Sequence, residues 1–282
     1  MIVIFDSNYV CHVCYHGMGE LSYKGMRTEV IFGFIKQVII MCEKFEPDQI
    51  AFCWDSPVSK RELIYPTYKL KRKGGRTEQE KKAFEPVKDQ FNKLRDIVLP
   101  KLGFSNIFCV EGYESDDLIA ALVKGRDPKE TIIITSDEDL YQLLDNCTIY
   151  SIGKKRSITR KDFISEYGIE PSQWAEVKAI AGCSTDEVEG IVGVGAQTAI
   201  LYMLGKITKG KKFDSIKNNR EQIMKRNTPL VKLPFDKTPT PKLKDNDMCF
   251  DQFDVICHRY GFESLLKDPY LKIWSKMIRR IK

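Results

Sequence analysis

The first 151 residues alternate short apolar runs with helical patterns, and this alternation constrains the fold more than any other feature of the chain. A helical pattern over Thr28–Phe45, for example, places its apolar residues on one face. Strands that alternate with helices predict an α/β fold, with a mostly parallel sheet and helices on both faces. The predicted strands are Ile2–Phe5, Gln49–Trp54, Asn106–Val110, Thr131–Thr135 and Thr148–Ser151.

The strand pattern stops at Thr159, and the remainder of the chain is predicted to be helical. Residues 205–245 form a Lys- and Pro-rich stretch that predicts no particular element, and helical segments follow it. We therefore place a boundary near residue 160, between an α/β domain over 1–160 and a mostly helical domain over 161–282. The first helices of the second domain are predicted at Lys161–Tyr167, Gln173–Ala181 and Ala196–Leu204.

The composition indicates a reduced, globular protein. Hydrophobic residues make up 43% of the 282 residues, which is enough for a sizeable core. The nine cysteines lack a framework spacing, so we expect free thiols and a reducing compartment. No apolar run reaches the roughly 18 residues that span a bilayer, and Met1 precedes a strand rather than a signal sequence. We therefore expect a cytoplasmic protein that does not act at a membrane.

Acidic residues follow four of the predicted strands, at the point where each strand ends. The carboxyl ends of parallel strands form the crevice where such folds bind ligands, so these acids are expected to converge. A cluster of carboxylates repels itself unless cations neutralise it, and Mg²⁺ prefers such oxygen ligands. Each acid alone could instead complement a helix N-terminus, but that alternative does not explain the joint pattern. The acids are Asp6, Asp55, Glu114, Asp116, Asp117, Asp137 and Asp139.

A basic stretch directly follows Asp55. Residues 56–83 contain nine Lys or Arg residues but only three Glu residues, together with Tyr65 and Tyr68. Cations that bind phosphates beside aromatic rings that stack on bases are typical of a single-strand channel. The alternative is a solvated lysine-rich loop. The position beside the acidic cluster favours nucleic-acid binding.

A glycine-rich turn lies in the helical domain. Gly190, Gly193 and Gly195 precede the helix predicted from Ala196, where backbone N–H groups can approach a phosphate. No strand is expected before this turn, which disfavours a nucleotide-binding fold of the Rossmann type.

Together these motifs resemble the structure-specific 5′-nucleases, which are the flap endonucleases and 5′–3′ exonucleases of the bacterial DNA-polymerase and phage type. The resemblance runs from Met1 to about Leu204. It implies a PIN-like nuclease core, a helical arch over about residues 56–98, and a helix-three-turn-helix DNA-binding module over about residues 173–204. The matching motifs are Val3–Ser7, Phe52–Ser56, Tyr68–Arg72, Glu114–Asp117, Thr135–Asp139 and Gly190–Gly195.

The resemblance also implies residue roles. Lys69 and Arg72 match arch residues that contact the scissile phosphate, and Asp116 and Asp137 are expected to be catalytic through the metals they hold. The glycine hairpin matches a loop that holds duplex DNA, with K⁺ as an expected ion there. The implied metal ligands are Asp6, Asp55, Glu114, Asp116, Asp117, Asp137, Asp139 and Asp186, and the implied DNA-binding residues are Tyr68, Lys69, Lys71, Arg72, Gly190, Gly193 and Gly195.

One motif departs from the family pattern. The family reads Gly-Asp-x-x-Asp-Asn before the glycine hairpin, whereas this chain has Cys183 in the place of the first Asp and Glu187 in the place of Asn. Asp186 keeps one ligand of the second metal. A neutral thiol is a poor Mg²⁺ ligand, while a thiolate suits softer metals. We therefore expect two Mg²⁺ ions of unequal affinity, with Mn²⁺ able to substitute.

The expected function is metal-dependent 5′-nuclease activity on branched or flapped DNA and on 5′ ends. Removal of RNA primers from an RNA–DNA hybrid is a further expectation. The expected partner is a replicative polymerase or a single-strand-binding protein. The enzyme is expected to be a monomer. The alternative is a catalytically weakened protein that binds branched DNA on the same fold. A PIN-type ribonuclease is disfavoured because the glycine hairpin suits duplex DNA.

Overall fold

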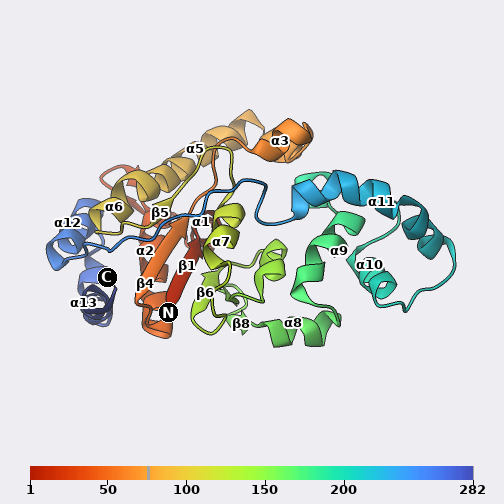
Figure 1. The fold of residues 1–282 in the computed structure, drawn as a ribbon. Coiled ribbons are helices and arrows are strands. Elements are labelled where there is room, and N and C mark those ends of the chain that lie inside the picture. The colour runs from red at the N-terminus through yellow and green to blue at the C-terminus, as the bar shows by residue number, and fades with distance from the viewer. Residues whose placement is uncertain (75–76, 282) are drawn as a thin grey trace.

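The computed structural model describes residues 1–74 and 77–281 and is organised around a six-stranded sheet, which lies at the centre of Figure 1. The strand order is β5-β4-β1-β6-β7-β8, and all pairs are parallel except β7–β8. The predicted parallel sheet is therefore confirmed, with antiparallel β8 as an addition at one edge. The bounds are β1 Ile2–Asp6, β4 Gln49–Cys53, β5 Ile107–Phe108, β6 Thr131–Ile134, β7 Thr148–Ser151 and β8 Arg156–Ile158.

The central strand β1 shows how the sheet is buried on both faces. Val3 and Phe5 point into one apolar cluster, and Ile2 and Ile4 point into the other. The first cluster includes side chains of α1 (Ser7–Gly17), α2 (Glu29–Phe45) and α5 (Glu78–Lys93). The second includes side chains of α7 (Ser115–Val123), the 3₁₀-helix η2 (Glu138–Leu143) and α9 (Trp174–Ala181). A strand that is covered on both faces reads as a continuous apolar run, which explains Ile2–Phe5.

The segment predicted to form an arch is mostly helical. It contains α3 (Lys60–Ile64), α4 (Leu70–Gly74), α5 and the π-helical turn η1 (Leu94–Val98), and α6 (Leu99–Lys101) follows it. A capping box between Thr77 and Glu80 begins α5. Gln90 of α5 accepts hydrogen bonds from the backbone N–H groups of Val30 and Ile31, which lie in the first turn of α2. This contact fixes the second half of the segment against the core.

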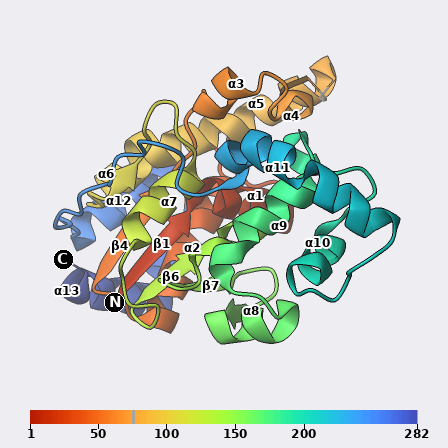
Figure 2. The ribbon, with the colours of Figure 1, turned by 45° about the vertical axis from the view of Figure 1, so that its right-hand side comes forward.

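The helical module lies to one side of the sheet (Figure 2). It comprises α8 (Arg160–Tyr167), the short 3₁₀-helix η3 (Pro171–Gln173), α9, α10 (Ala196–Met203) and α11 (Lys211–Val231), and α11 packs along α9. The sequence predicted no element in the Lys- and Pro-rich stretch that holds α11. The helix gives no clear apolar pattern in the sequence, because most of its residues are polar and few of them are buried.

A small β-ribbon joins α9 to the glycine hairpin, so the prediction that no strand follows Thr159 was wrong. β9 (Gly182–Cys183) pairs with β10 (Val188–Glu189), and the 3₁₀ turn η4 (Ser184–Asp186) connects them. A Cβ atom at Gly190 would lie 2.1 Å from the carbonyl carbon of Ala181. Glycine is therefore required here for the close approach of two backbones. Two-residue strands leave no periodic signal in a sequence. A second two-residue ribbon, β2 (Ser22–Tyr23) with β3 (Met26–Arg27), was missed for the same reason.

The last helices return to the first domain. Phe253 of α12 (Phe250–Tyr260) stacks on Trp274 of α13 (Tyr270–Arg280), with ring centroids 4.2 Å apart. A 3₁₀ turn, η5 (Glu263–Leu266), connects the two helices, and both contribute to the apolar cluster that contains α2. Figure 1 places them on the opposite side of the molecule from α10. A division of the chain at residue 160 does not predict this placement, because the two helices pack with the first 160 residues.

Candidate active site

Four carboxylates from separate elements gather at the carboxyl edge of the sheet. Asp6 ends β1, and the parallel register of Asp6 with Cys53 places Asp55 just beyond the neighbouring strand. Ser115 joins them, since its backbone N–H donates to Asp55 Oδ1 at 2.8 Å and its hydroxyl lies 3.4 Å from Asp6 Oδ1. Asp116 follows in the first turn of α7, and Asp137 follows β6. The structure thus brings Asp6, Asp55, Asp116 and Asp137 together as predicted.

The cluster is electrostatically strained. Burial, together with Asp55 and Asp137, raises the pKa of Asp6 to about 7. Desolvation and then Asp137 hold the pKa of Asp116 well above its usual value, and desolvation with Asp139 raises that of Asp137. Among the described side chains, which do not include those of Arg72 and Lys73, no ion pair involves Asp6, Asp55, Asp116 or Asp137. Hard divalent cations with oxygen ligands fit such a donor set.

Asp117 has different surroundings, and its predicted role as a metal ligand needs correction. Its carboxylate is fully buried and accepts two hydrogen bonds from the Arg61 guanidinium, at 2.7 and 2.8 Å. It also accepts from the backbone N–H of Phe235 at 2.8 Å. Both carboxylate oxygens are therefore engaged within the protein. Asp117 fastens α3 and the segment after α11 to the start of α7.

Arg61 is a residue that the sequence analysis did not single out. Besides holding Asp117, it donates from Nε to the carbonyl oxygen of Leu230 at 2.9 Å. It is one of nine cations in the basic stretch. Arg61 is only 2% exposed, whereas the other described cations of the stretch are half-buried or exposed. A sequence pattern cannot mark which cation of such a stretch turns inward.

Lys69 and Tyr68 lie at the site as predicted, but both contact Glu114. Lys69 Nζ donates to Glu114 Oε2 at 2.8 Å, and the Tyr68 hydroxyl donates to the same oxygen at 3.1 Å. Burial alone would raise the pKa of Glu114, but Lys69 and Arg61 outweigh it and the net pKa is lowered. Glu114 is therefore an ionised carboxylate that is neutralised largely by the protein itself.

The base of the arch is tied to the β-ribbon. The Lys69 backbone N–H donates to the carbonyl oxygen of Asp186 at 3.1 Å, and the Lys71 N–H donates to the Glu187 carboxylate. The Lys71 side chain is exposed. The side chain of Arg72 lies outside the described residues, so its predicted phosphate contact stays a prediction.

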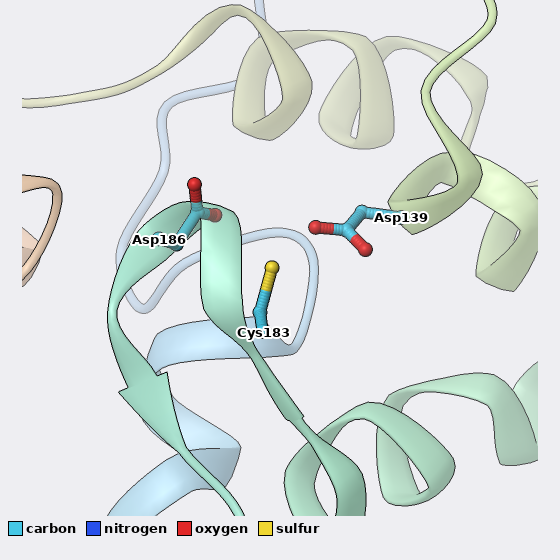
Figure 3. A group of neighbouring side chains, drawn as sticks. All are labelled: Asp139, Cys183 and Asp186. Carbon is cyan, nitrogen blue, oxygen red and sulfur yellow. The ribbon is translucent and has the colours of Figure 1, made fainter. Parts of the chain in front are cut away.

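A cleft of about 90 Å³ is lined by Lys69, Asp116 and Asp137. A second group of possible metal ligands lines the same cleft. One ligand atom each from Asp139, Cys183 and Asp186 lies within 4.8 Å of the others (Figure 3). Lys178 of α9, which the sequence analysis missed, lies 2.6 Å from Asp139 Oδ1. Its signal was weak, because nothing in the predicted helix 173–181 shows that this lysine faces the acids.

The glycine hairpin follows the β-ribbon and leads into α10. Val192 at its tip is 94% exposed, Gly193 has φ +74°, and Gly195 is the N-cap of α10. The exposed backbone around Gly193 and Gly195 is compatible with the predicted approach to a phosphate. Gly190 has the packing role described above.

Comparison with known proteins identifies the family. A family model described as the 5′–3′ exonuclease N-terminal resolvase-like domain matches residues 1–168. The chain belongs to the 5′–3′ exonuclease family. A 5′–3′ exonuclease of Aquifex aeolicus is 30% identical over 222 residues, which cover 77% of this chain and 71% of that protein. DNA polymerase I of Bacillus subtilis is 29% identical over 231 residues, but these span only 24% of its length.

Solved structures of other nucleases share the fold. The phage T5 5′-exonuclease with bound divalent zinc ions aligns with a TM-score of 0.68 at 20% identity, over 100% of this chain and 99% of that one. Flap endonuclease-1 of Methanococcus jannaschii aligns with a TM-score of 0.56 at 15% identity, over 99% and 92%. The predicted α/β nuclease fold is thereby confirmed.

Membership in a family of hydrolytic DNA 5′-nucleases, with the acidic cluster, also indicates divalent-metal use. It does not favour the catalytically weakened alternative. Among the described residues, no helix has the length and apolar character needed to cross a bilayer.

Proposed function

We propose that this chain is a divalent-metal-dependent 5′-nuclease that cleaves phosphodiester bonds at 5′ flaps and 5′ ends of branched or duplex DNA. The observation that carries the proposal is the carboxylate cluster of Asp6, Asp55, Asp116 and Asp137. None of the four forms an ion pair with a described side chain, and the pKa values of Asp6, Asp116 and Asp137 are raised despite the nearby lysines. Cation binding is expected to stabilise the folded protein, because it relieves the repulsion between these carboxylates.

Mg²⁺ is the proposed metal, with Mn²⁺ as a substitute. The four carboxylates of the cluster would hold one Mg²⁺ ion. Asp137, Asp139, Cys183 and Asp186 would hold a second divalent cation, with weaker affinity for Mg²⁺. Two ions held there would supply an activated water and would stabilise the charge on the scissile phosphate and the leaving oxygen. Glu114 supports the site indirectly, because it fixes the ammonium group of Lys69 at the edge of the cleft.

The chain's own cations position the substrate. Lys69 lies in the same cleft as Asp116 and Asp137, so a phosphate bound between them would meet its ammonium group. Such a preorganised charge stabilises the negative charge that develops during hydrolysis. We propose that Arg72 assists from the next turn of the arch, with Tyr68 and Lys71 beside them.

Duplex binding is proposed for the helical module. The backbone around Gly193 and Gly195, with K⁺ as the proposed ion, would contact DNA phosphates. We retain the division into a catalytic domain over 1–160, with an arch over about 56–98, and a DNA-binding domain from 161 with its helix-three-turn-helix over about 173–204. Helices α12 and α13 pack with the first of these.

The wider role remains a proposal as well. RNA primers in RNA–DNA hybrids are proposed substrates, and a replicative polymerase or a single-strand-binding protein is the proposed partner. Several relatives that carry a similar segment are DNA polymerase I proteins, which supports work beside a polymerase. All nine cysteines lie among the described residues and are free thiols, which suits the proposed cytoplasmic location. We propose a monomer.

The test is cleavage of end-labelled DNA. A 5′-flap, a nicked duplex, a blunt duplex and an RNA–DNA hybrid are incubated with Mg²⁺, Mn²⁺ or chelator. We expect short 5′ products from the flap in Mg²⁺ and none in chelator. Cleavage that persists in chelator, or binding without cleavage in any metal, would overturn the proposal.

A further inference from the structure

The second group of donors differs from the carboxylate cluster in its chemistry. Asp139 comes from η2, whereas Cys183 and Asp186 come from the β-ribbon region, so segments distant in sequence place two carboxylates and one sulfur around one point. Figure 3 shows the Cys183 sulfur between the two carboxylates. Carboxylate oxygens alone would suit Mg²⁺, but a sulfur donor changes which cation the site prefers.

The donors are held by rigid surroundings. Cys183 pairs with Val188 in the β-ribbon and is 7% exposed, and its sulfur lies 3.0 Å from the Thr185 hydroxyl. Asp186 is 9% exposed, and its carbonyl oxygen accepts the hydrogen bond from Lys69. Donors on fixed backbone lose little freedom when they bind a metal. The burial of Cys183 and the contact of its sulfur with Thr185 favour a sulfur that stays beside the two carboxylates.

The group already attracts a cation. The Lys178 ammonium lies 2.6 Å from Asp139 Oδ1, and the side chain of Lys178 is 18% exposed. This ion pair is independent of the donor geometry. A divalent cation that binds this group would therefore displace the Lys178 ammonium from Asp139.

We propose that the Asp139–Cys183–Asp186 group is a mixed oxygen–sulfur site that selects a thiophilic divalent cation, of the Zn²⁺ and Co²⁺ class, over Mg²⁺. The inference rests on the proposed function, since it concerns the second metal position of that site. Mg²⁺ demands near-octahedral oxygen coordination, whereas Zn²⁺ accepts four ligands drawn from sulfur and carboxylate. Two carboxylates, one thiolate and one water complete such a set. On binding, the Cys183 thiol releases its proton to solvent.

The experiment uses Co²⁺, because a cobalt–thiolate bond gives a near-ultraviolet charge-transfer band that carboxylates do not give. The full chain is titrated with Co²⁺ in the absence of DNA, and then with Zn²⁺ or Mg²⁺ as competitor. We expect the band to appear, to be displaced by equimolar Zn²⁺ and to survive a large excess of Mg²⁺. Absence of the band, or its removal by Mg²⁺ as readily as by Zn²⁺, would overturn the proposal.

Two variants and a control assign the sulfur. Cys183→Ser should abolish the band and weaken Zn²⁺ binding by at least about tenfold, a loss that even outer-shell partners can cause. Cys183→Asp should also abolish the band but strengthen Mg²⁺ binding. Cys249→Ser is the matched control, because Cys249 is the N-cap of α12, where serine is well tolerated, and it should keep the band. A band that persists in Cys183→Ser would place the metal on another cysteine and refute the assignment.

This measurement is separate from the nuclease assay. If the chain cuts no DNA but shows the Cys183-dependent band, the proposed function fails while the mixed site stands. If it cuts flaps in Mg²⁺ without forming the band, the function stands and the mixed site is wrong. Circular dichroism melting of each variant verifies that the loss of the band does not reflect unfolding.

Discussion

Asp116 and Asp117 are neighbours in the first turn of α7, yet they occupy opposite electrostatic surroundings. Asp117 is enclosed with the guanidinium of Arg61 in a two-hydrogen-bond pair. Asp116 instead faces Asp6, Asp55 and Asp137, and its pKa is held well above its usual value by desolvation and by those charges. Among the described residues, the chain pairs Asp117 with a cation but forms no ion pair with Asp116, which is the carboxylate that we propose binds a cation from solution.

Within one motif, Asp117 therefore has a structural role, whereas Asp116 has surroundings suited to metal binding. A buried ion pair that is complete on both sides holds elements together, and breaking it is costly because it leaves a buried charge. Carboxylates that repel each other destabilise the metal-free fold but create affinity for a metal. The Glu114–Lys69 contact lies between these regions, since it neutralises an acid and also fixes a cation at the cleft.

The largest expected effect is on the Asp116 side. Asp116→Ala or Asp137→Ala should lower cleavage of a 5′-flap by at least the roughly 10²–10³-fold that loss of one transition-state-stabilising donor costs. DNA binding should stay nearly unchanged, because it depends on phosphate contacts elsewhere. Single-turnover cleavage and filter binding measure the two quantities. Cleavage near the wild-type rate in either variant would refute the site assignment.

Neutralising each aspartate should move stability in opposite directions. Asp117→Asn should lower the free energy of unfolding by about 3–5 kcal/mol, because Arg61 is left buried without its partner. Asp116→Asn should raise the stability of the metal-free protein at pH 8, because it removes a repulsion. Urea unfolding in the presence of chelator measures both. Equal changes in the two variants would mean that the comparison is mistaken.

The pH dependence of stability follows from the pKa of Asp6, which is about 7 in the folded protein against 3.8 ordinarily. Between these values the folded state holds the proton more tightly, so the metal-free protein should lose stability as the pH rises from about 4 to about 7. The loss is at most about 4 kcal/mol. Urea unfolding of wild type and Asp6→Asn at pH 5 and pH 8 tests this. The variant keeps an N-cap for α1 and should show a smaller loss. A wild-type protein that is more stable at pH 8 would contradict the expectation.

Lys69→Ala should slow the chemical step by about a hundredfold while weakening duplex binding far less. The reason is that Lys69 is aimed at the cleft by Glu114 rather than at the outer surface. Lys101→Ala removes an exposed lysine of α6 and serves as the control, with no expected change in single-turnover rate. If Lys69→Ala altered only binding, its role would be general electrostatic attraction.

The smallest expected effect concerns Mg²⁺ demand. Wild type should require more Mg²⁺ than Cys183→Asp for half-maximal cleavage, by several-fold, and should work relatively better in Mn²⁺. Metal titrations of both proteins measure the midpoints. Superimposable Mg²⁺ curves would mean that Cys183 only packs in the ribbon.

Local patterns predicted the sheet and most of the acidic site. The strand ends are visible in the sequence, because a strand buried on both faces is continuously apolar and Asp6 or Asp55 stands directly after it. Because the carboxyl ends of parallel strands meet at one edge of the sheet, acids that follow different strands lie close together. The sequence also marked Tyr68 and Lys69, which do lie beside the acids.

The remaining features depend on contacts between distant segments. Arg61 and Asp117 pair across 56 residues, and the chain near Leu230 and Phe235 completes their surroundings. No local pattern distinguishes Asp117 from Asp116, since both would suit the first turn of a helix. Lys178 and the return of α12 and α13 to the first domain are likewise set by tertiary packing.

Thermal unfolding at pH 8, in chelator and then in excess Mg²⁺, tests most directly whether solution cations neutralise the sheet-edge carboxylates. A ligand that binds only the folded state raises its melting temperature. We predict a clear rise in wild type, and in Asp116→Asn a higher starting temperature with a much smaller rise. An unchanged wild-type melting temperature, or an equal rise in both proteins, would contradict the account.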